Sequence, residues 1–478
     1  MQNTLFVTGF FDLEEDRSKD KSVETCFAYF NDLARTKIFI HLFLSPSYKD
    51  IYASICGDNA NVTITYMDLK GMKIYKALEG LSVKLPSVRT EDHDTRAFLT
   101  LMNSKVELVH TAMQMFTGYV SYAWIDFSIF HVLKEKEASS KFLHMLAHTR
   151  FQDSSLFIPG CLQRNDNYIF EAVNWRFCGG FFLGSPDAIQ EIYSLYETHF
   201  RNIVIQEGLT WEVNMWAYFE KEFGWNPQWY PADHNDSIIR IPSTHIKVVA
   251  SLTTIPSRLD TLQSTIDSLL VQVDHVYISV PREYKRFSEK WTSPPYMLTE
   301  PYLSSVTIIS CDDFGPATKY IGVRSKAPSN TWVFVCDDDQ EYHPTLIKRM
   351  KESFNEVAVY QNRYESIRMD TSGGMIHGFV GLCINTHSLS NIYKMELPEC
   401  AYFVDDQWMS IYCFKNSIPI LSTRINEYID IFKVLYNNHE KIGADSLGAL
   451  NNRVNMVQAI EKYFNVSIVN KPDITKRN

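Results

Sequence analysis

The sequence lacks the features that mark several common classes of protein. Its nine cysteines are an odd number and include no C-x-x-C pair, which argues against a structural zinc site and favours reduced thiols in the core. No apolar run approaches the ~18–20 residues that cross a bilayer, and the first residues do not resemble a secretory signal. We therefore expect a cytoplasmic protein with no transmembrane segment.

Basic blocks and low-complexity segments are also missing. The formal net charge is -10, and no cluster of Lys or Arg suggests a track for nucleic acid, so no nucleic-acid partner is expected. A composition of 45% hydrophobic and 14% aromatic residues is that of a globular protein. With 478 residues, the chain exceeds the roughly 100–200 residues of one domain and predicts two or three.

The best domain boundary is a short polar break at 237–246, after which a new strand begins at Lys247. We expect domains at 1–240 and 246–478. The two halves share a plan, because each opens with an apolar strand and a helix and each later has an apolar strand ending in Asp. This alternation predicts α/β domains, each with a mostly parallel mixed sheet and helices on both faces. Such sheets bind ligands at the carboxyl ends of their strands.

Hydrophobic runs and helical spacing predict individual elements in both halves. In the first half we expect a helix around 105–115 and strands at 5–11, 37–44, 62–66 and 122–126. In the second half we expect strands at 248–252, 274–280 and 331–336. A helix should follow Ser257, because Ser257-x-x-Asp260 has the form of a capping box and the residues after it are apolar on one face.

An acidic strand end is the sharpest feature of the second half. Asp337, Asp338 and Asp339 directly follow an apolar run. Side chains alternate along an extended chain, so Asp337 and Asp339 should point the same way. Adjacent anions repel one another unless a cation binds them. Mn²⁺ and Mg²⁺ prefer oxygen ligands and can bridge carboxylates to a diphosphate. A solvated acidic turn would show the same sequence.

Three further elements of this half could belong to the same site. Lys319 follows a Gly-Pro turn at Gly315 and could hold a phosphate or the acidic strand end. Glycines within 373–381 would let a ligand approach the backbone closely. Asp405 and Asp406 lie at an expected helix start, where one of them could act as a general base. Acids at a helix N-terminus are also ordinary partners of the helix dipole.

Together these elements resemble the GT-A glycosyltransferases, and the resemblance covers most of 246–420. In that superfamily a D-x-D-type motif ends an apolar strand and a later acidic pair supplies the base. The resemblance implies that Asp337 faces the donor nucleotide, that Asp339 holds the metal, with Asp337 beside it, and that Asp406 or Asp405 is the base. It also implies donor contacts from Thr253, Arg258, Lys319 and Asp338.

The first half resembles a different group, the HtrL/YibB-like glycosyltransferase family. The matching elements are the W-I-D-F run that contains Asp126, the N-S-K run upstream and the T-W-E-V-N run downstream. The match spans nearly all of 4–237. Asp126 ends an apolar strand, but Ser128 stands where a second carboxylate would complete a metal clamp.

Other residues could complete the site of the first half. Asp126 and His234 could share a metal, since imidazole and carboxylate together suit Mn²⁺. His234 could equally be an exposed loop residue. Near the end of the chain, His439 could also be an exposed surface residue, or it could be a late ligand of the metal or of a phosphate. Glu212 could act on the acceptor or simply cap a helix. The remaining candidates for donor contacts here are Thr8, Lys105 and Gly180.

The resemblances imply a bifunctional, metal-dependent glycosyltransferase, a hexosyl- or pentosyltransferase, built from two GT-A-like, Rossmann-like nucleotide-sugar-binding domains in tandem. Its cofactor would be Mn²⁺ or Mg²⁺, its donor a nucleotide-diphosphate sugar, above all a UDP-sugar, and its acceptor a hydroxyl of a glycan or glycoconjugate. The candidate base favours inversion in the second half. Two alternatives stay open. One is a single active second half beside a silent glycan-binding or scaffolding half. The other is a glycoside hydrolase, which would not explain the triple-Asp strand end.

Overall fold

The computed structural model describes residues 2–13, 22–151, 155–164, 170–286, 302–362, 375–435 and 453–466. The chain forms two compact units. Unit 1 comprises Met1–Ala147 and Gln152–Pro242, and unit 2 comprises His148–Phe151 and Ser243–Asn478. The final division between the units therefore falls inside the polar break of the sequence. No helix in the described ranges is long and apolar enough to cross a membrane.

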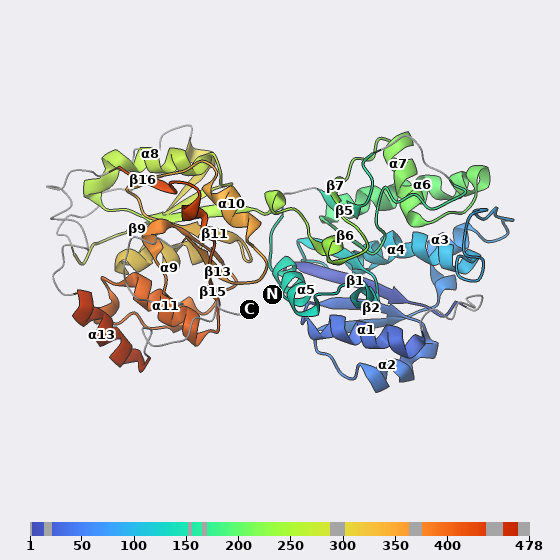
Figure 1. Cartoon of the computed structure of the whole chain (residues 1–478), viewed down its shortest axis with the longest axis horizontal. Coiled ribbons are helices and arrows are strands. Elements are labelled where there is room, and N and C mark those ends of the chain that lie inside the picture. The colour runs from blue at the N-terminus through green and yellow to red at the C-terminus, as the bar shows by residue number, and fades with distance from the viewer. Residues whose placement is uncertain are drawn as a thin grey trace. The chain divides into compact units, whose positions relative to one another are not determined.

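Unit 1 is built on a seven-stranded sheet with the order β3-β2-β1-β4-β6-β5-β7 (Figure 1). Its strands are β1 (Thr4–Phe10), β2 (Ile40–Leu44), β3 (Val62–Tyr66), β4 (Ser121–Ile125), β5 (Leu156–Gly160), β6 (Phe181–Gly184) and β7 (Gln228–Pro231). Its helices are α1 (Val23–Arg35), α2 (Lys49–Ile55), α3 (Lys73–Ala77), α4 (Arg96–Met115), α5 (Lys136–Ala147), α6 (Pro186–Glu207) and α7 (Glu212–Glu222).

Helices cover both faces of this sheet because its central strands are apolar on both sides. Leu5 and Val7 of β1 join a core cluster that includes Leu108 of α4 and apolar residues of α6 and α7. Side chains alternate along a strand, so Phe10 lies on the opposite face. There it contacts Phe27 of α1, with 5.2 Å between the ring centroids.

Unit 2 contains a second seven-stranded sheet, with the order β10-β9-β8-β11-β14-β13-β15, and a two-stranded sheet of β12 and β16. Its strands are β8 (Val248–Thr253), β9 (Val276–Pro281), β10 (Val306–Cys311), β11 (Trp332–Val335), β12 (Gln340–Tyr342), β13 (Val359–Gln361), β14 (Leu382–Asn385), β15 (Ile420–Ser422) and β16 (Phe432–Val434). Its helices are α8 (Leu259–Leu270), α9 (Thr318–Arg324), α10 (Leu346–Glu352), α11 (Asp405–Lys415) and α13 (Arg453–Phe464).

The two large sheets have the same strand order and the same strand directions. In unit 1, β2 and β4 are parallel to β1 and β6 is antiparallel to β4. In unit 2, β9 and β11 are parallel to β8 and β14 is antiparallel to β11. Each unit is therefore a mixed α/β fold in which parallel pairs dominate. The strand order reverses between β1 and β4 and between β8 and β11, and such reversals are where open α/β sheets bind ligands, outside the carboxyl strand ends.

Core packing in unit 2 fixes two helices against the end of β11. Val333 and Val335 of β11 belong to one apolar cluster with Tyr320 of α9 and Trp408 of α11. Trp332 points to the other face, where it stacks on Phe354, with 4.1 Å between the ring centroids. The starts of α9 and α11 are thereby held beside the residues that follow β11.

The expected elements agree with the structure at most positions, and one expectation needs correction. Pro256–Arg258 form a 3₁₀ turn and α8 starts after it, with Arg258 at the N-cap. Proline pre-sets the φ angle of that turn. The Ser257-x-x-Asp260 capping box stays a prediction, because the side chain of Asp260 lies outside the described part of the protein. Helix α4 starts at Arg96, well before the expected 105–115, because Thr95 caps it by accepting a hydrogen bond from the Phe98 N–H at 3.2 Å.

Candidate active site

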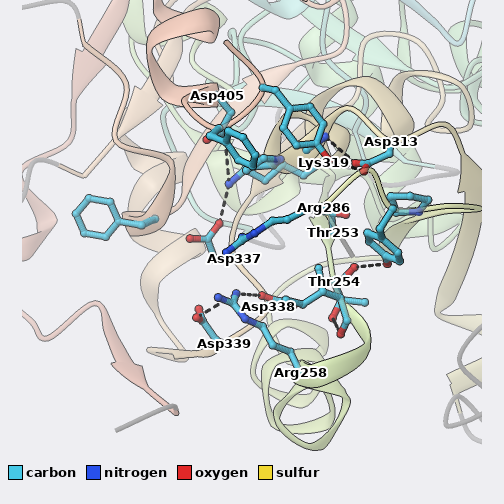
Figure 2. Close-up of a pocket in the computed structure, with 18 of the residues that line it drawn as sticks. Thr253, Thr254, Arg258, Arg286, Asp313, Lys319, Asp337, Asp338, Asp339 and Asp405 are labelled. Atoms are coloured by element: carbon cyan, nitrogen blue, oxygen red, sulfur yellow. Dashed lines mark hydrogen bonds and ion pairs between the residues drawn. The ribbon is translucent and has the colours of Figure 1, made fainter. Parts of the chain in front are cut away.

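A cavity of about 380 Å³ lies in unit 2 at the carboxyl ends of β8 and β11 (Figure 2). This is the position at which the strand order of the sheet reverses. Eight residues that the sequence analysis assigned to this half line the cavity. They are Thr253, Arg258, Lys319, Asp337, Asp338, Asp339, Asp405 and Asp406. The predicted residues come from separate elements, and the fold brings them to one place.

A buried lysine holds the first pair of carboxylates. Lys319 Nζ donates to Asp337 Oδ1 at 2.7 Å and lies 3.4 Å from Asp405 Oδ2, and only 4% of its side chain is exposed. Ser251 Oγ donates to the backbone oxygen of Lys319 at 2.7 Å, which ties α9 to β8. Burial acts to lower the pKa of Lys319, but the carboxylates of Asp337 and Asp405 hold it well above its ordinary value. Lys319 therefore stays charged and offsets part of the negative charge of the two acids.

An arginine just after β8 holds the second pair. Arg258 Nη1 donates to Asp338 Oδ1 at 2.7 Å and lies 3.2 Å from Asp339 Oδ2. Asp338 Oδ2 is buried and has no hydrogen-bond partner in the described part of the protein. Burial raises the pKa of Asp339 to about 6. The Arg258 charge opposes this shift, and the carboxylates of Asp337 and Asp338 add to it. The charge of these acids is only partly compensated.

Asp406 is the carboxyl group that is most strongly altered by its surroundings. It lies in the first turn of α11 with 7% of its surface exposed, and its Oδ1 accepts a hydrogen bond from Gly378 N at 2.9 Å. Burial raises the pKa of Asp406 to about 8, the charge of Asp405 adds to the shift, and Lys319 opposes it. A Cβ at Gly378 would lie 2.6 Å from Asp406 Oδ1, so only glycine lets the backbone reach this carboxyl group. A pKa near the working pH suits a general base.

The cavity contains more acids than bases. Six aspartates line it, against three Arg or Lys side chains, so a diphosphate would enter only with a compensating cation. Carboxylate oxygens are the ligands that Mg²⁺ and Mn²⁺ prefer, and Asp338 Oδ2 has no partner of its own. The residues therefore fit a divalent cation. No group of three or more His, Cys, Asp or Glu side chains in the described ranges is placed to hold a metal ion by itself. Water and phosphate oxygens would complete the shell, as is usual for Mg²⁺.

Several lining residues were not assigned from the sequence. Asp313, which follows β10, accepts hydrogen bonds from Lys285 N at 2.7 Å and from the Tyr402 hydroxyl. The hydroxyl of Tyr284, which follows β9, donates to the backbone oxygen of Thr254 at 2.7 Å. No local pattern marks these residues. The available signal was that parallel neighbours of β8 must end at the same edge of the sheet. The cavity is also lined by Arg286, Phe379, Phe403 and Val434.

Unit 1 has a second buried lysine in the equivalent place. Lys105 Nζ donates to Glu212 Oε1 at 2.8 Å and to the backbone oxygen of Gly179 at 2.9 Å, and it lies 3.1 Å from Asp126 Oδ1. Burial acts to lower the pKa of Lys105, but the charges of Asp126 and Glu212 raise it above the ordinary value. Two hydrogen bonds and one ion pair therefore hold the ammonium group within the protein. A contact between Lys105 and the donor stays a prediction.

The other candidates of unit 1 lie at varying distances from this lysine. Asp126 accepts a hydrogen bond from Trp124 Nε1 at 2.7 Å, and its backbone N–H donates to Gly180 O at 2.9 Å. Thr8 is fully buried within β1. His234 lies in an exposed loop after β7, where its ring centroid is 5.4 Å from that of His131. The fold thus gathers Lys105, Glu212 and Gly180 around Asp126, and a metal shared by Asp126 and His234 stays a prediction. Gly373, Gly374 and His439 lie outside the described residues.

No protein-family model matches the chain, and no curated protein sequence does. Solved structures with some similarity to the backbone of this chain include glucosyl-3-phosphoglycerate synthase from Mycobacterium tuberculosis in complex with Mn²⁺, UDP and phosphoglyceric acid. It has 11% identity and a TM-score of 0.29, with 46% of this chain and 79% of that chain covered. A Drosophila β-1,4-galactosyltransferase 7 variant with manganese, UDP-Gal and xylobiose has 10% identity and a TM-score of 0.28, with 44% and 79% covered.

A third structure with such similarity is 4-diphosphocytidyl-2C-methyl-D-erythritol synthase from Anaerococcus prevotii. It has 9% identity and a TM-score of 0.25, with 48% of this chain and 88% of that chain covered. Because all these TM-scores are low, we base the proposed function on the residues of this chain alone.

Proposed function

We propose that unit 2 is a metal-dependent glycosyltransferase that moves a sugar from a nucleotide-diphosphate donor, above all a UDP-sugar, to a hydroxyl of a glycan or glycoconjugate. One observation carries the proposal. The carboxylates that follow β11 and those that begin α11 line one cavity at the strand-order reversal. A glycoside hydrolase would also use two carboxylates, but it has no need for an acidic excess beside the position where nucleotides bind such sheets.

The carboxylates after β11 would hold Mn²⁺ or Mg²⁺. Asp339 is the best ligand, with Asp337 or Asp338 beside it, and the cation when bound would stabilise negative charge on the leaving diphosphate. Lys319 would keep Asp337 and Asp405 in place, because its ammonium contacts both. The two acids can then lie near each other without mutual repulsion.

Asp406 would take the proton from the acceptor hydroxyl. Its pKa of about 8 makes it a stronger base than an ordinary carboxylate, and the Gly378 N–H orients it. Asp405 is the weaker candidate because its Oδ2 lies 3.4 Å from the ammonium group of Lys319. Attack by an acceptor activated in this way displaces the diphosphate directly, which inverts the anomeric centre.

Unit 1 admits two functions, a second transferase or a silent glycan-binding or scaffolding unit. The contacts of Lys105 support the second function, because two hydrogen bonds and an ion pair hold its ammonium group within the protein. The residue after Glu212 is Val213, which is buried in the core, so unit 1 has no counterpart to the second acid of α11. A bifunctional enzyme would need donor contacts from other residues.

A thermal-shift screen of nucleotide-sugar donors with the full chain and Mn²⁺ tests the proposal. A bound donor should raise the melting temperature, and Asp339→Ala should remove the rise. Asp312→Ala is the matched control, since Asp312 is an exposed aspartate next to Asp313 that pairs with Arg282. The proposal fails if no donor shifts the melting temperature of the wild-type protein, or if the shift persists in Asp339→Ala.

A further inference from the structure

Four of the six carboxylates that line the cavity are paired with two cations, Lys319 and Arg258, which differ in how freely their side chains can move. Lys319 holds Asp337 and Asp405, is 4% exposed and belongs to a helix bonded to β8. Arg258 holds Asp338 and Asp339, and 23% of its side chain is exposed. It ends a short 3₁₀ turn rather than lying within a packed helix. Of the two cations, Arg258 is the one whose contacts can change without moving a helix.

We propose that Arg258 and the divalent cation exchange places. Arg258 holds Asp339 when no cation is bound, and it releases Asp339 to contact the donor diphosphate when the cation binds. This inference rests on the proposed function. Its starting point is the contact of 3.2 Å between Arg258 Nη1 and Asp339 Oδ2.

Mutual exclusion at Asp339 follows from charge and distance. A divalent cation binds a carboxylate oxygen at about 2.0–2.6 Å. A guanidinium still in contact with the same carboxylate would then face the cation across a few ångströms inside a partly buried cavity, where like charges repel strongly. Arg258 therefore competes with the cation for Asp339. Asp338 Oδ1, at 2.7 Å from the same nitrogen, can keep the arginine in the cavity while it turns.

The released guanidinium would contact the donor diphosphate, which has few other positively charged partners in the cavity. Aspartates outnumber Arg and Lys in the cavity lining by six to three, and Lys319 is already committed to two of those aspartates. A guanidinium offers five N–H donors in a planar fork that suits phosphate. The exchange therefore adds a phosphate donor at the moment when the cation and the diphosphate arrive together.

Two binding measurements on the full chain test the exchange. The first is Mn²⁺ affinity without nucleotide, from the electron paramagnetic resonance signal of free Mn²⁺. The second is UDP affinity at saturating Mn²⁺, from calorimetry. For Arg258→Met we expect the two affinities to change in opposite directions. Mn²⁺ should bind about tenfold more tightly, because its competitor is removed. UDP should bind at least about tenfold more weakly, because a charge-assisted hydrogen bond to the diphosphate is removed.

Matched variants separate the exchange from a general loss of charge. Arg282→Met removes an exposed arginine of the same unit, paired with Asp312, and should change neither affinity. Arg258→Lys keeps the charge and loses the fork, so its Mn²⁺ affinity should stay near that of the wild type while its UDP affinity falls. Thermal unfolding of each variant confirms that it is folded.

Each other outcome overturns the exchange. If Arg258→Met weakens Mn²⁺ binding, the arginine positions the carboxylates for the cation and does not compete with it. If neither affinity changes, Arg258 has no part in binding. If the wild-type protein binds neither Mn²⁺ nor UDP with Mn²⁺, the proposed function itself fails. That result is distinguishable, because it is read from the wild type and not from the variant.

Discussion

Units 1 and 2 share a strand order and a buried lysine held between two acids. Lys105 contacts Asp126 and Glu212, and Lys319 contacts Asp337 and Asp405. In both units the first acid follows a central strand of the sheet, and the second is the first residue of a helix. Unit 1 has the same arrangement, although no further acid directly follows Glu212. We therefore infer that the lysine primarily stabilises the fold, by offsetting the charge of two acids where a helix meets a strand end.

The units differ in the residues just beyond this shared framework. Two positions after the strand-end aspartate, unit 2 has Asp339 and unit 1 has Ser128. One position after the acid that begins the helix, unit 2 has Asp406 and unit 1 has Val213. The acids proposed for metal binding and for proton transfer are thus the ones that unit 2 has in addition. An acid that is paired with the buried lysine therefore says little about catalysis. An additional acid that the lysine does not hold is a better indication of a catalytic or metal-binding role.

The largest expected effect comes from the additional acid after β11. Asp339→Ala should reduce the release of UDP from a UDP-sugar by roughly 10³-fold or more, because the leaving diphosphate loses its cation. Ser128→Ala makes the corresponding change in unit 1 and should leave the rate unchanged. A loss of rate in Ser128→Ala would place chemistry in unit 1 and break the comparison.

The second effect concerns the additional acid of α11. Asp406→Asn should keep Mn²⁺-dependent UDP affinity and lower turnover by about 10²–10⁴-fold, the usual cost of removing a general base. Because the carboxyl group must lose its proton to act and its pKa is about 8, wild-type turnover should rise with pH up to about 8. The residual activity of Asp406→Asn should lack this rise. Loss of UDP affinity in this variant would assign Asp406 to donor binding.

The shared lysines should matter equally to stability. Lys105→Met and Lys319→Met each leave two acids without their cation, and each should lower the free energy of unfolding by about 3–5 kcal/mol, measured by urea denaturation. Lys73→Met is the control, because Lys73 pairs with Glu197 at 2.7 Å but is 68% exposed. That control should cost about 0–1 kcal/mol. A small effect at one of the two buried lysines would show that the units do not share this framework.

The smallest expected effect concerns a short segment of the chain that packs with unit 2 and has no counterpart in unit 1. His148–Phe151 belong to unit 2 although the chain on either side belongs to unit 1. Trp332 Nε1 donates to Thr149 Oγ1 at 3.2 Å in a buried position. Thr149→Val should therefore cost about 1–2 kcal/mol by leaving a buried N–H unsatisfied, read from urea denaturation. No change would mean that this hydrogen bond does not stabilise unit 2.

The sequence predicted those residues of the site that directly follow the end of a strand. Val333 to Val335 form an apolar run that had to be a strand, and the aspartates after it had to lie at its carboxyl end. The remaining lining residues, such as Asp313 and Tyr284, depend on which strands lie beside β8, and a single sequence does not show strand order. The start of α8 has a local cause, because Pro256 opens a 3₁₀ turn and the helix begins only after it, at Leu259.

The contacts of Lys105 were also out of reach of the sequence. Lys105 was expected to contact the donor, and the structure shows that it donates to Glu212 and Gly179 and lies 3.1 Å from Asp126. These partners lie far from it along the chain. Only the packing of α4 and α7 beside the end of β4 brings them together.

The most direct test of the account is a calorimetric titration of the full chain with UDP at saturating Mn²⁺. We predict one UDP site per chain, which disappears when EDTA removes the metal and is lost in Asp339→Ala but retained in Asp126→Ala. Two sites per chain, or a single site that survives Asp339→Ala, would contradict the assignment of donor binding to unit 2.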